Sequence, residues 1–386
     1  MRIFTLIILS LSAIAFCTAQ SVDGPIVFGK VRNVSVGPDR SIWLTTQTGN
    51  VYYTPHVDSL WLPGLQTNPD VSYAGLAASF DRILFFSKDT ALIFGNIRCS
   101  PDASDRNCIY RTVDGGLNWH AVQFGDKGAW VRHGQVVGGG VALISASSGR
   151  IYRTTDHGAT WVTLPKIFGK EKEAYYRAPD LWSFHYMNDS VAIATNRSDH
   201  LAVTGNDFTT ATRIPTPLDQ GLFDRVYKPY YLNGKGRKYV DNWKIDKVRI
   251  FRDSYVIMQN GTMYQSGRDK IAWKASSVEV FDFEVDQASG RLFAVTVDQG
   301  VGEMDHDFNF VSWAVVATGQ VLQSMRVVDD RVFLLYPNYV DPSGKDVVRE
   351  QIAGMTVVEK NHRASSGYYV FEVTPEGVRL SSVRAQ

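Results

Sequence analysis

The chain has 386 residues, of which 44% are hydrophobic and 12% aromatic, which is enough for a large apolar core. Lysine and arginine total 40, and aspartate and glutamate total 39. This near-neutral balance argues against nucleic acid as a partner, because nucleic-acid-binding surfaces depend on an excess of positive charge.

The first 19 residues have the composition of a secretory signal peptide. Arg2 precedes an apolar run over 3–16, and small residues end the segment at Ala19. The run is too short for a membrane anchor, and no later stretch is long enough to span a bilayer. We therefore predict a signal peptide over 1–19 and a single domain over 20–386. This predicts a secreted or extracellular protein, or a periplasmic one if the source is bacterial.

Two cysteines remain after the signal peptide, Cys99 and Cys108. An even pair in a secreted chain predicts a disulfide that closes a short loop, and two free thiols are the alternative. The pair lacks the Cys-x-x-Cys spacing of a zinc site, and the eight histidines are scattered. The sequence predicts no metal site and no cofactor.

Seven segments repeat one order of short strands separated by Gly, Asn and Asp turns, which is typical of an all-β repeat fold. In chain order they cover 31–62, 83–124, 131–164, 182–214, 244–275, 280–316 and 322–383.

One turn occurs twice with the same residues. Thr112-x-Asp114-x-Gly116-x-Asn118-Trp119 is followed by Thr154-x-Asp156-x-Gly158-x-Thr160-Trp161, with 42 positions between the tryptophans. This period suits one propeller blade of about 40–45 residues. The Thr and Asp side chains can bond backbone N–H groups in a tight turn, and the glycines can adopt positive φ. The tryptophans can bury their rings between neighbouring sheets.

Both copies resemble the Asp-box, or bacterial neuraminidase repeat, Ser/Thr-x-Asp-x-Gly-x-Thr-Trp. The second copy matches it fully, and the first departs only at Asn118. The resemblance is to the Asp-box β-propeller superfamily, whose members include sialidases, xyloglucanase-like glycosidases, sortilin-type receptors and photosystem II assembly-factor-like propellers. It implies that the motif residues build turns away from the active face and are not catalytic. These structural residues are Thr112, Asp114, Gly116, Trp119, Thr154, Asp156, Gly158 and Trp161.

The fold class we predict is all-β, a seven-bladed β-propeller with Asp-box turns. Weaker turns support it, because Thr54 to Trp61 and Ser266 to Trp273 keep the seven-residue step of the two full copies. The triplets 206–208 and 306–308, Asn-Asp-Phe and His-Asp-Phe, are placed at the equivalent turn of two further segments. An irregular β-sandwich is the alternative, but it would not predict this register.

Five long connections are expected at the end of the propeller opposite the Asp-boxes, because successive antiparallel strands alternate their turns between the two ends. These connections are 63–82, 98–108, 165–181, 215–243 and 337–367. Long loops on a rigid scaffold often carry function, so this end is the predicted functional face.

Tyrosines alternate with basic residues in two of these connections, a composition that can stack on sugars and hold acidic groups. A solvated loop whose tyrosines pack on the rim is the alternative. The candidate binding residues are Tyr175, Tyr176, Arg177, Tyr227, Lys228, Tyr230, Tyr231, Lys235, Arg237 and Lys238.

Asn188, Asn196 and Asn260 begin N-glycosylation sequons in predicted turns. A fourth sequon at Asn33 lies in a predicted strand and is the poorest candidate. Chance occurrence is the alternative for all four.

The preferred function is a binding or scaffold module for a protein or glycan, acting as a monomer, and a glycoside hydrolase is the alternative. A sialidase would carry Arg-Ile-Pro near the start of a six-bladed propeller, whereas the only copy here, at 213–215, follows both Asp-boxes. A glycosidase with paired carboxylates would need two loop acids that converge. The acids in the predicted loops are Asp70, Asp180, Asp219, Asp224 and Asp241, and the sequence identifies no catalytic residue among them.

Overall fold

The computed structural model describes most of the chain after residue 29 as β-strands joined by turns. The described residues are 30–57, 59–66, 78–99, 107–125, 129–147, 149–165, 183–188, 190–195, 201–206, 208–217, 245–259, 261–286, 288–316, 321–338, 350–352, 355–357 and 367–384. Within these ranges no helix occurs, which confirms the all-β prediction.

Each of the first four sheets contains four consecutive antiparallel strands. The first holds β1 (Val31–Val36), β2 (Ile42–Thr46), β3 (Asn50–Thr54) and β4 (Leu62–Gln66). The second holds β5 (Ala78–Phe85), β6 (Ala91–Ile97), β7 (Cys108–Thr112) and β8 (His120–Gln123). The third holds β9 (Val131–Gly138), β10 (Val141–Ala146), β11 (Ile151–Thr154) and β12 (Val162–Thr163). The fourth holds β13 (Ser183–Tyr186), β14 (Ala192–Thr195), β15 (Leu201–Thr204) and β16 (Thr212–Ile214).

The next sheet is continuous over seven strands because one long strand is shared. It runs through β17 (Ile245–Phe251), β18 (Ser254–Gln259), β19 (Thr262–Gly267), β20 (Lys274–Val285), β21 (Leu292–Thr296), β22 (Gly300–Met304) and β23 (Phe310–Val315). Up to Glu279, β20 pairs with β19, and from Val280 it pairs with β21. The prediction of seven blades requires that β20 be counted twice, and it stays a prediction.

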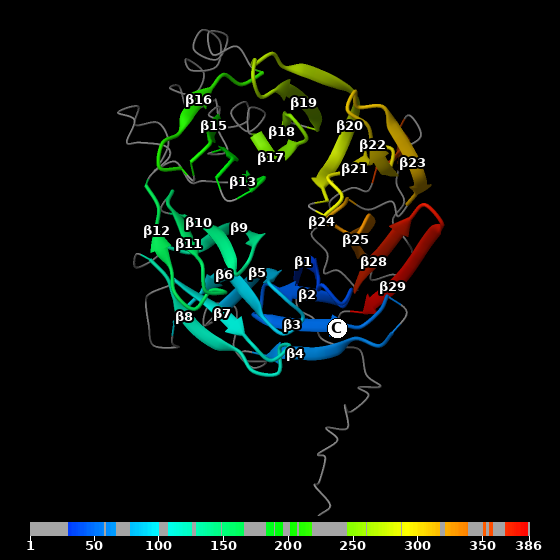
Figure 1. Cartoon of the computed structure of the whole chain (residues 1–386). Helices are drawn as coiled ribbons and strands as arrows, with labels where there is room; N and C mark the ends of the chain where they lie inside the picture. Colours follow the sequence, from blue (N-terminus) through cyan, green and yellow to red (C-terminus); the bar gives the residue numbers. More distant parts are fainter. Residues whose placement is uncertain are drawn as a thin grey trace, which may run out of the picture.

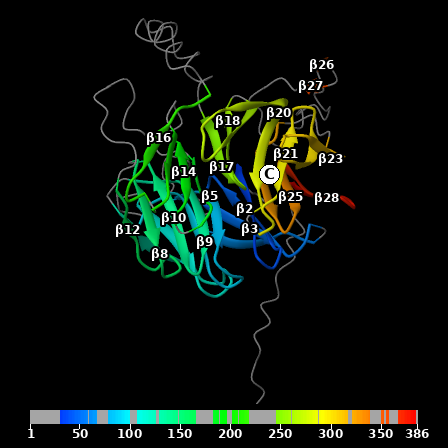
Figure 2. The same cartoon turned by 45° about the horizontal axis from the view of Figure 1, so that its top comes forward.

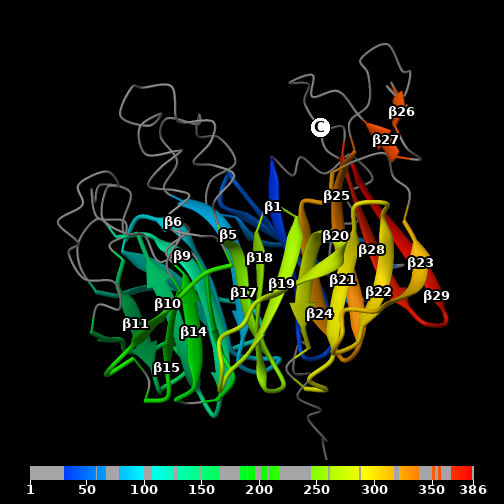
Figure 3. The ribbon, with the colours of Figure 1, turned by 90° about the horizontal axis from the view of Figure 1, so that it is seen from above.

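The last four-stranded sheet contains an inserted hairpin. Its strands are β24 (Ser324–Val328), β25 (Arg331–Asn338), β28 (Gly367–Thr374) and β29 (Gly377–Arg384). The hairpin of β26 (Glu350–Ile352) and β27 (Met355–Val357) lies between β25 and β28 in the chain. Figure 2 and Figure 3 show this hairpin outside the ring, at one end of the propeller.

The sheets stand around a central channel, as Figure 1 shows. Neighbouring sheets contact each other through their innermost strands, in the order β1, β5, β9, β13, β17, β20, β24 and back to β1. The apolar core is divided among these contacts. Trp43 and Val51 of the first sheet, for example, pack with Phe80 and Ile93 of the second. Each sheet therefore buries its faces against its neighbours, which is how a propeller stabilises its ring.

Side-chain hydrogen bonds close the ring between the first and last sheets. The backbone N–H of Val31 donates to the hydroxyl of Tyr368 (2.9 Å), and Trp61 Nε1 donates to Ser381 Oγ (2.9 Å). Residues of both sheets share one buried apolar cluster. The two ends of the described chain are thus joined by packing and by buried hydrogen bonds.

The two Asp-box turns form as the sequence predicts. Thr154 Oγ1 accepts from the backbone N–H of Gly158 (2.9 Å) and donates to Asp156 (2.7 Å). Asp156 accepts from the backbone N–H (2.9 Å) and hydroxyl (2.6 Å) of Thr160. Burial acts to raise the pKa of Asp156, but hydrogen bonds from Thr160 and Thr154 outweigh it and lower the pKa to about 2. The carboxylate is therefore an ionised turn cap.

The first copy has the same arrangement around Asp114. This carboxylate accepts from the Asn118 backbone N–H (2.9 Å) and amide (2.7 Å), and from Thr112 (2.8 Å). Hydrogen bonds from Asn118 and then from Thr112 lower the pKa of Asp114 to about 2. Asn118 therefore replaces the usual threonine without loss of the cap.

The glycines and tryptophans of the motif bring neighbouring sheets together. Gly158 has φ of 82°, and a Cβ added there would lie 2.5 Å from Leu92 Cδ2 of the preceding sheet. Trp161 packs on the apolar cluster between the second and third sheets, and Trp119 on the cluster between the first and second. Both rings are partly buried where neighbouring sheets meet.

Two later turns, near the triplets 206–208 and 306–308, are capped in the same way. Asn206 Oδ1 accepts from the backbone N–H of Thr210 (3.0 Å), and Asp305 Oδ1 accepts from that of Asn309 (2.8 Å). In each turn the capping side chain lies four positions before the N–H from which it accepts, as in the turns of Asp114 and Asp156. Asp307 donates its backbone N–H to Asp305 (2.8 Å).

The predicted disulfide joins Cys99 to Cys108, with 5.2 Å between the Cα atoms. It connects the end of β6 to the start of β7.

We predict that Gly158→Ala lowers the free energy of unfolding by about 2–4 kcal/mol, because it combines positive φ with a clash against Leu92. Gly139→Ala is the matched control, since Gly139 also has positive φ but has no atom within 4 Å of an added Cβ. It should cost about 1 kcal/mol. Chemical denaturation measures both, and equal losses would show that the close approach to Leu92 is unimportant.

We also predict that Tyr368→Phe destabilises the protein by about 1–3 kcal/mol, because it leaves the buried N–H of Val31 without its acceptor. The neighbouring Tyr369→Phe, whose ring is only half-buried, serves as the control. Denaturant unfolding compares them, and an unchanged midpoint for Tyr368→Phe would contradict this role in ring closure.

Candidate functional site

Polar and charged side chains occupy alternate positions of the innermost strands. β17 carries Lys247 and Arg249, and β20 carries Asp282 and Glu284. Residues two apart share one face of a strand, so each pair is presented together on the channel side. Lys247 and Arg249 are only 9% and 5% exposed. Charges buried this deeply require partners, because desolvation penalises an isolated ion.

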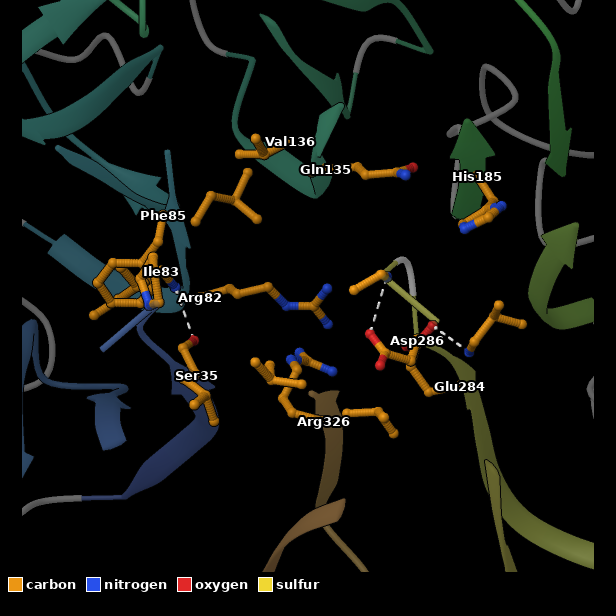
Figure 4. A pocket seen from close by; sticks show the side chains of 18 of the residues that line it. Ser35, Arg82, Ile83, Phe85, Gln135, Val136, His185, Glu284, Asp286 and Arg326 are labelled. Atoms are coloured by element: carbon orange, nitrogen blue, oxygen red, sulfur yellow. Dashed lines mark hydrogen bonds between the residues drawn. The ribbon is translucent and has the colours of Figure 1, made fainter. Parts of the chain in front are cut away.

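A cavity of about 420 Å³ lies in the channel and is lined by residues of every innermost strand. Figure 4 shows Arg82 of β5 and Arg326 of β24 extending into it toward the same region, with Glu284 on the facing side. His185 of β13 lines a further part of the wall. The cavity is therefore built by the ring as a whole.

The two carboxylates of the channel are held in a buried ion-pair network. Arg249 forms a two-point ion pair with Glu284, with NH2 2.6 Å from Oε2. Lys247 Nζ lies 3.0 Å from Glu284 Oε2 and 2.8 Å from Asp282 Oδ1. Burial acts to raise the pKa of Glu284, but the charges of Arg249 and Lys247 outweigh it and hold the pKa well below its usual range. Glu284 is therefore not available as a proton donor near neutral pH.

Arg82 and Arg326 have no carboxylate partner among the described residues. Arg326 donates to Asn33 Oδ1 (2.8 Å) and to its neighbour's carbonyl, that of Met325 (2.5 Å). The Arg82 guanidinium has no hydrogen-bond acceptor within the described ranges. Burial, and then repulsion from Arg326, lowers the pKa of Arg82 well below its usual value. Two guanidinium groups thus share the cavity at a cost in electrostatic energy.

His185 is a neutral donor that lacks an acceptor. Its Nδ1 accepts from the backbone N–H of Ile250 (3.1 Å), which assigns the proton to Nε2. Nε2 is buried and has no hydrogen-bond partner in the described structure. Burial, and then the charge of Arg249, lowers the pKa of His185 to about 3. The ring is therefore uncharged at neutral pH.

His133 is neutral for similar reasons. Its ring meets Phe184 edge-on at a centroid distance of 4.8 Å. Burial, and then the charges of Arg82 and Arg249, holds the pKa of His133 well below its usual value. Neither histidine adds positive charge to the channel.

Six charged side chains of the innermost strands form one layer around the channel, which we call the charged layer. Within it, two carboxylates, Asp282 and Glu284, face four cations, so the layer has an excess of two positive charges. The cations are Arg82, Lys247, Arg249 and Arg326. Two further carboxylates lie at the rim, and neither pairs with Arg82 or Arg326. Asp329 pairs with Arg40 (3.3 Å). Asp286 accepts from the backbone N–H groups of Ala288 (3.2 Å) and Asp330 (3.1 Å) and from Ser289 (3.1 Å). The rim acids are thus engaged in turns and a surface pair.

The cavity extends to the end of the propeller that carries the first-to-second turns. Its lining includes Gly37 and Pro38, between β1 and β2, and Ala288, between β20 and β21. Antiparallel pairing puts the Asp-box turns, which join third to fourth strands, at this same end. The sequence analysis placed the functional face at the opposite end, and that placement stays a prediction.

The predicted binding residues fall outside the described ranges. This applies to all ten candidates, Tyr175, Tyr176, Arg177, Tyr227, Lys228, Tyr230, Tyr231, Lys235, Arg237 and Lys238, to the five loop acids, and to Asn196 and Asn260. Asn188 is described and exposed, and its Oδ1 caps a turn by accepting from the backbone of Ser190 (3.0 Å) and Val191 (2.9 Å). Asn33 accepts from Arg326 in the channel. Among the described residues no three His, Cys, Asp or Glu side chains gather as a metal site requires.

The sequence analysis missed the channel residues, although a signal for them was present. Lys247-x-Arg249 and Asp282-x-Glu284 place charges two apart, in alternation with apolar residues of β17 and β20. A strand buried on both faces should be continuously apolar. Pairs of basic residues in one predicted innermost strand and pairs of acidic residues in the next therefore indicate that these strands line a polar channel.

The chain shares its fold with solved β-propellers of low sequence identity. YCF48 bound to D1 peptide superposes with a TM-score of 0.56 at 13% identity, over 81% of this chain and 90% of that one. A catalytically inactive virginiamycin B lyase from Staphylococcus aureus with quinupristin gives 0.54 at 9% identity, over 80% and 92%. The extracellular domain of the one-component system BT4673 from B. thetaiotaomicron gives 0.52 at 11% identity, over 93% and 40%.

These similarities define the class of protein, and the chain is a β-propeller. No protein-family model and no curated protein matches its sequence. At such low identities the comparisons establish the fold alone. Within the described residues, no helix has the length and apolar character needed to cross a membrane.

We predict that the buried histidines make the protein less stable in mild acid. The pKa of His185 is lower in the folded protein than in the unfolded chain, where it is about 6.5, so its contribution is complete above pH 6.5 and is lost as the pH falls toward 3. Between pH 7.5 and 5 the loss from His185 is about 2 kcal/mol.

In the His185→Asn variant, the side-chain amide oxygen can still accept a hydrogen bond from the backbone N–H of Ile250. The free energy of unfolding of this variant should therefore fall less between pH 7.5 and 5, by the contribution of His185. The exposed His120→Asn is the control. Urea unfolding at the two pH values gives the comparison, and identical pH dependence in the wild type and His185→Asn would refute the prediction.

Proposed function

We propose that the chain is a secreted β-propeller that acts as a binding or scaffold module for a protein or glycan partner. The partner is held by the long connections rich in tyrosine and basic residues, on the face opposite the Asp-box turns. The protein works as a monomer, and the disulfide between Cys99 and Cys108 supports a location outside the cell.

The main support for this proposal is that the carboxylates in the channel are held in ion pairs. Glu284 and Asp282 are paired with Arg249 and Lys247, and the rest of the cavity offers hydrogen-bond donors. Such an arrangement favours recognition of a ligand over acid–base catalysis. Carboxyl-based glycoside hydrolysis needs one acid with a raised pKa beside a second carboxylate, whereas the charges of Arg249 and Lys247 lower the pKa of Glu284.

The fold comparisons are compatible with a binding role. One propeller of similar fold is described with a bound D1 peptide, and another is the extracellular domain of a bacterial sensor system. Propellers offer a rigid ring from which loops project, and such loops are common binding surfaces.

The proposal predicts that replacing Tyr230, Tyr231, Arg237 and Lys238 together by alanine reduces capture of partners from native extract at least tenfold. The loss follows from removal of aromatic stacking and charge-assisted hydrogen bonds. The surface substitution Lys274→Gln, far along the chain from this loop, is the control. Quantitative affinity capture measures the effect, and unchanged capture by the quadruple variant would exclude this site.

The glycoside hydrolase alternative is tested in parallel by incubating the purified protein with sialosides and β-glucans. Turnover that is abolished by one loop-carboxylate substitution, among Asp70, Asp180, Asp219, Asp224 and Asp241, would establish the enzyme and overturn the binding module.

A further inference from the structure

We propose that the channel cavity is a binding site for an oxyanion with two negative charges, such as a phosphoryl group or a dicarboxylate. The site is formed by the guanidinium groups of Arg82 and Arg326 and by the Nε2–H of His185. This inference adds a ligand class to the binding module proposed above, but it uses none of the loop residues, so either proposal can fail alone.

The first support is the hydrogen-bonding character of the wall. Arg82 has five N–H donors and no acceptor among the described residues, and Arg326 uses only part of its donor set on Asn33 and Met325. The buried Nε2–H of His185, a side chain that is 6% exposed, also lacks an acceptor. Buried donors are normally satisfied, so the unpaired Nε2–H of His185 beside two guanidinium groups that still have N–H donors to offer indicates a ligand that supplies acceptors.

The second support is that the protein's own anions cannot fill this role. Glu284 is saturated by Arg249 and Lys247, and Asp282 by Lys247. At the rim, Asp329 pairs with Arg40, and Asp286 caps the turn before β21. Arg82 and Arg326 therefore remain as two cations without a carboxylate partner among the described residues, and together they favour a ligand with two negative charges.

The third support is the chemistry of the donors. Guanidinium groups bind carboxylate and phosphoryl oxygens through paired N–H donors, and these charge-assisted bonds are about twice as strong as neutral ones. Neutral His185 donates one further N–H without adding charge. The cavity volume of about 420 Å³ falls within the range of small-molecule sites, about 300–1,000 Å³, so it has room for the anionic group and for what is attached to it.

The fourth support is energetic. Burial, and then repulsion from Arg326, lowers the pKa of Arg82, so the charged form of Arg82 is disfavoured in the unliganded protein. Charged groups that destabilise the folded protein and have no oppositely charged partner within it are typical of functional sites. A bound dianion would neutralise both charges and stabilise the ring.

The test is isothermal titration calorimetry of the full mature chain at pH 7.5 and low, constant ionic strength. The probes are inorganic phosphate, sulfate and succinate, each titrated separately, with thermal unfolding recorded in the same buffers. We expect saturable binding with one site per chain and a melting temperature that rises with probe concentration. The tighter of phosphate and succinate identifies a phosphoryl or a dicarboxylate ligand.

Two substitutions and one control make the test specific. Arg82→Gln and Arg326→Gln should each weaken binding about tenfold or more, because each removes charge-assisted bonds. Without the probes, Arg82→Gln should melt no lower than the wild type, since it relieves repulsion and breaks no hydrogen bond to a described residue. Lys274→Gln removes one charge from an exposed pair with Asp307 (3.5 Å) and should bind as the wild type does.

Three results would overturn the proposal. They are the absence of saturable binding for all three probes, wild-type affinity in Arg82→Gln, and an equal loss of affinity in Lys274→Gln, which would indicate general charge screening. Partner capture by the loops is not affected by any of them, so the proposed function is judged separately.

Discussion

The circular stacking of the sheets is the constraint on which the rest of the structure depends. Each sheet covers its apolar faces only when it has a neighbour on both sides, and the first and last sheets obtain theirs from each other. Val31 and Trp61 are bound to Tyr368 and Ser381, residues more than three hundred positions away in the chain. Such contacts form late and over long distances in the sequence, which makes the ring cooperative.

The same constraint produces the charged channel. Innermost strands that converge on one axis must place alternate side chains in a common space with little water. Lys247, Arg249 and Glu284 satisfy this requirement by pairing. A buried pair of this kind contributes little net stability compared with apolar packing, because desolvation offsets the attraction. Its value is to fix the positions of the groups around the cavity.

Much of the fold could be predicted from the sequence, because its evidence is local. The spacing within Thr154–Trp161 specifies a turn, the 42-residue period specifies a blade, and the alternation of strands specifies the ends at which turns meet. The later turns are harder to recognise in the sequence, because the motif there has lost its glycine and tryptophan. Asn206 and Asp305 are identified only by the four-residue step to the N–H that each caps.

The candidate site could not be predicted in the same way. Arg82, His185 and Arg326 are separated by about a hundred residues or more, and only the closed ring brings them to one cavity. In the sequence each is an isolated polar residue in a strand. His185 illustrates the limit, because its protonation state follows from the backbone N–H of Ile250 and the charge of Arg249, both from another sheet. The connections rich in tyrosine and basic residues, in contrast, could be selected as candidates from their local composition alone.

The shared strand β20 has a structural consequence. Its backbone runs without interruption from the outer edge of one sheet, at Lys274, to the channel at Glu284. The two sheets are thus joined by continuous β-structure that is hydrogen-bonded to β19 up to Glu279 and to β21 from Val280. A molecule docked at the outer edge near Lys274 would contact the same strand that presents Glu284 to Arg249 and Lys247.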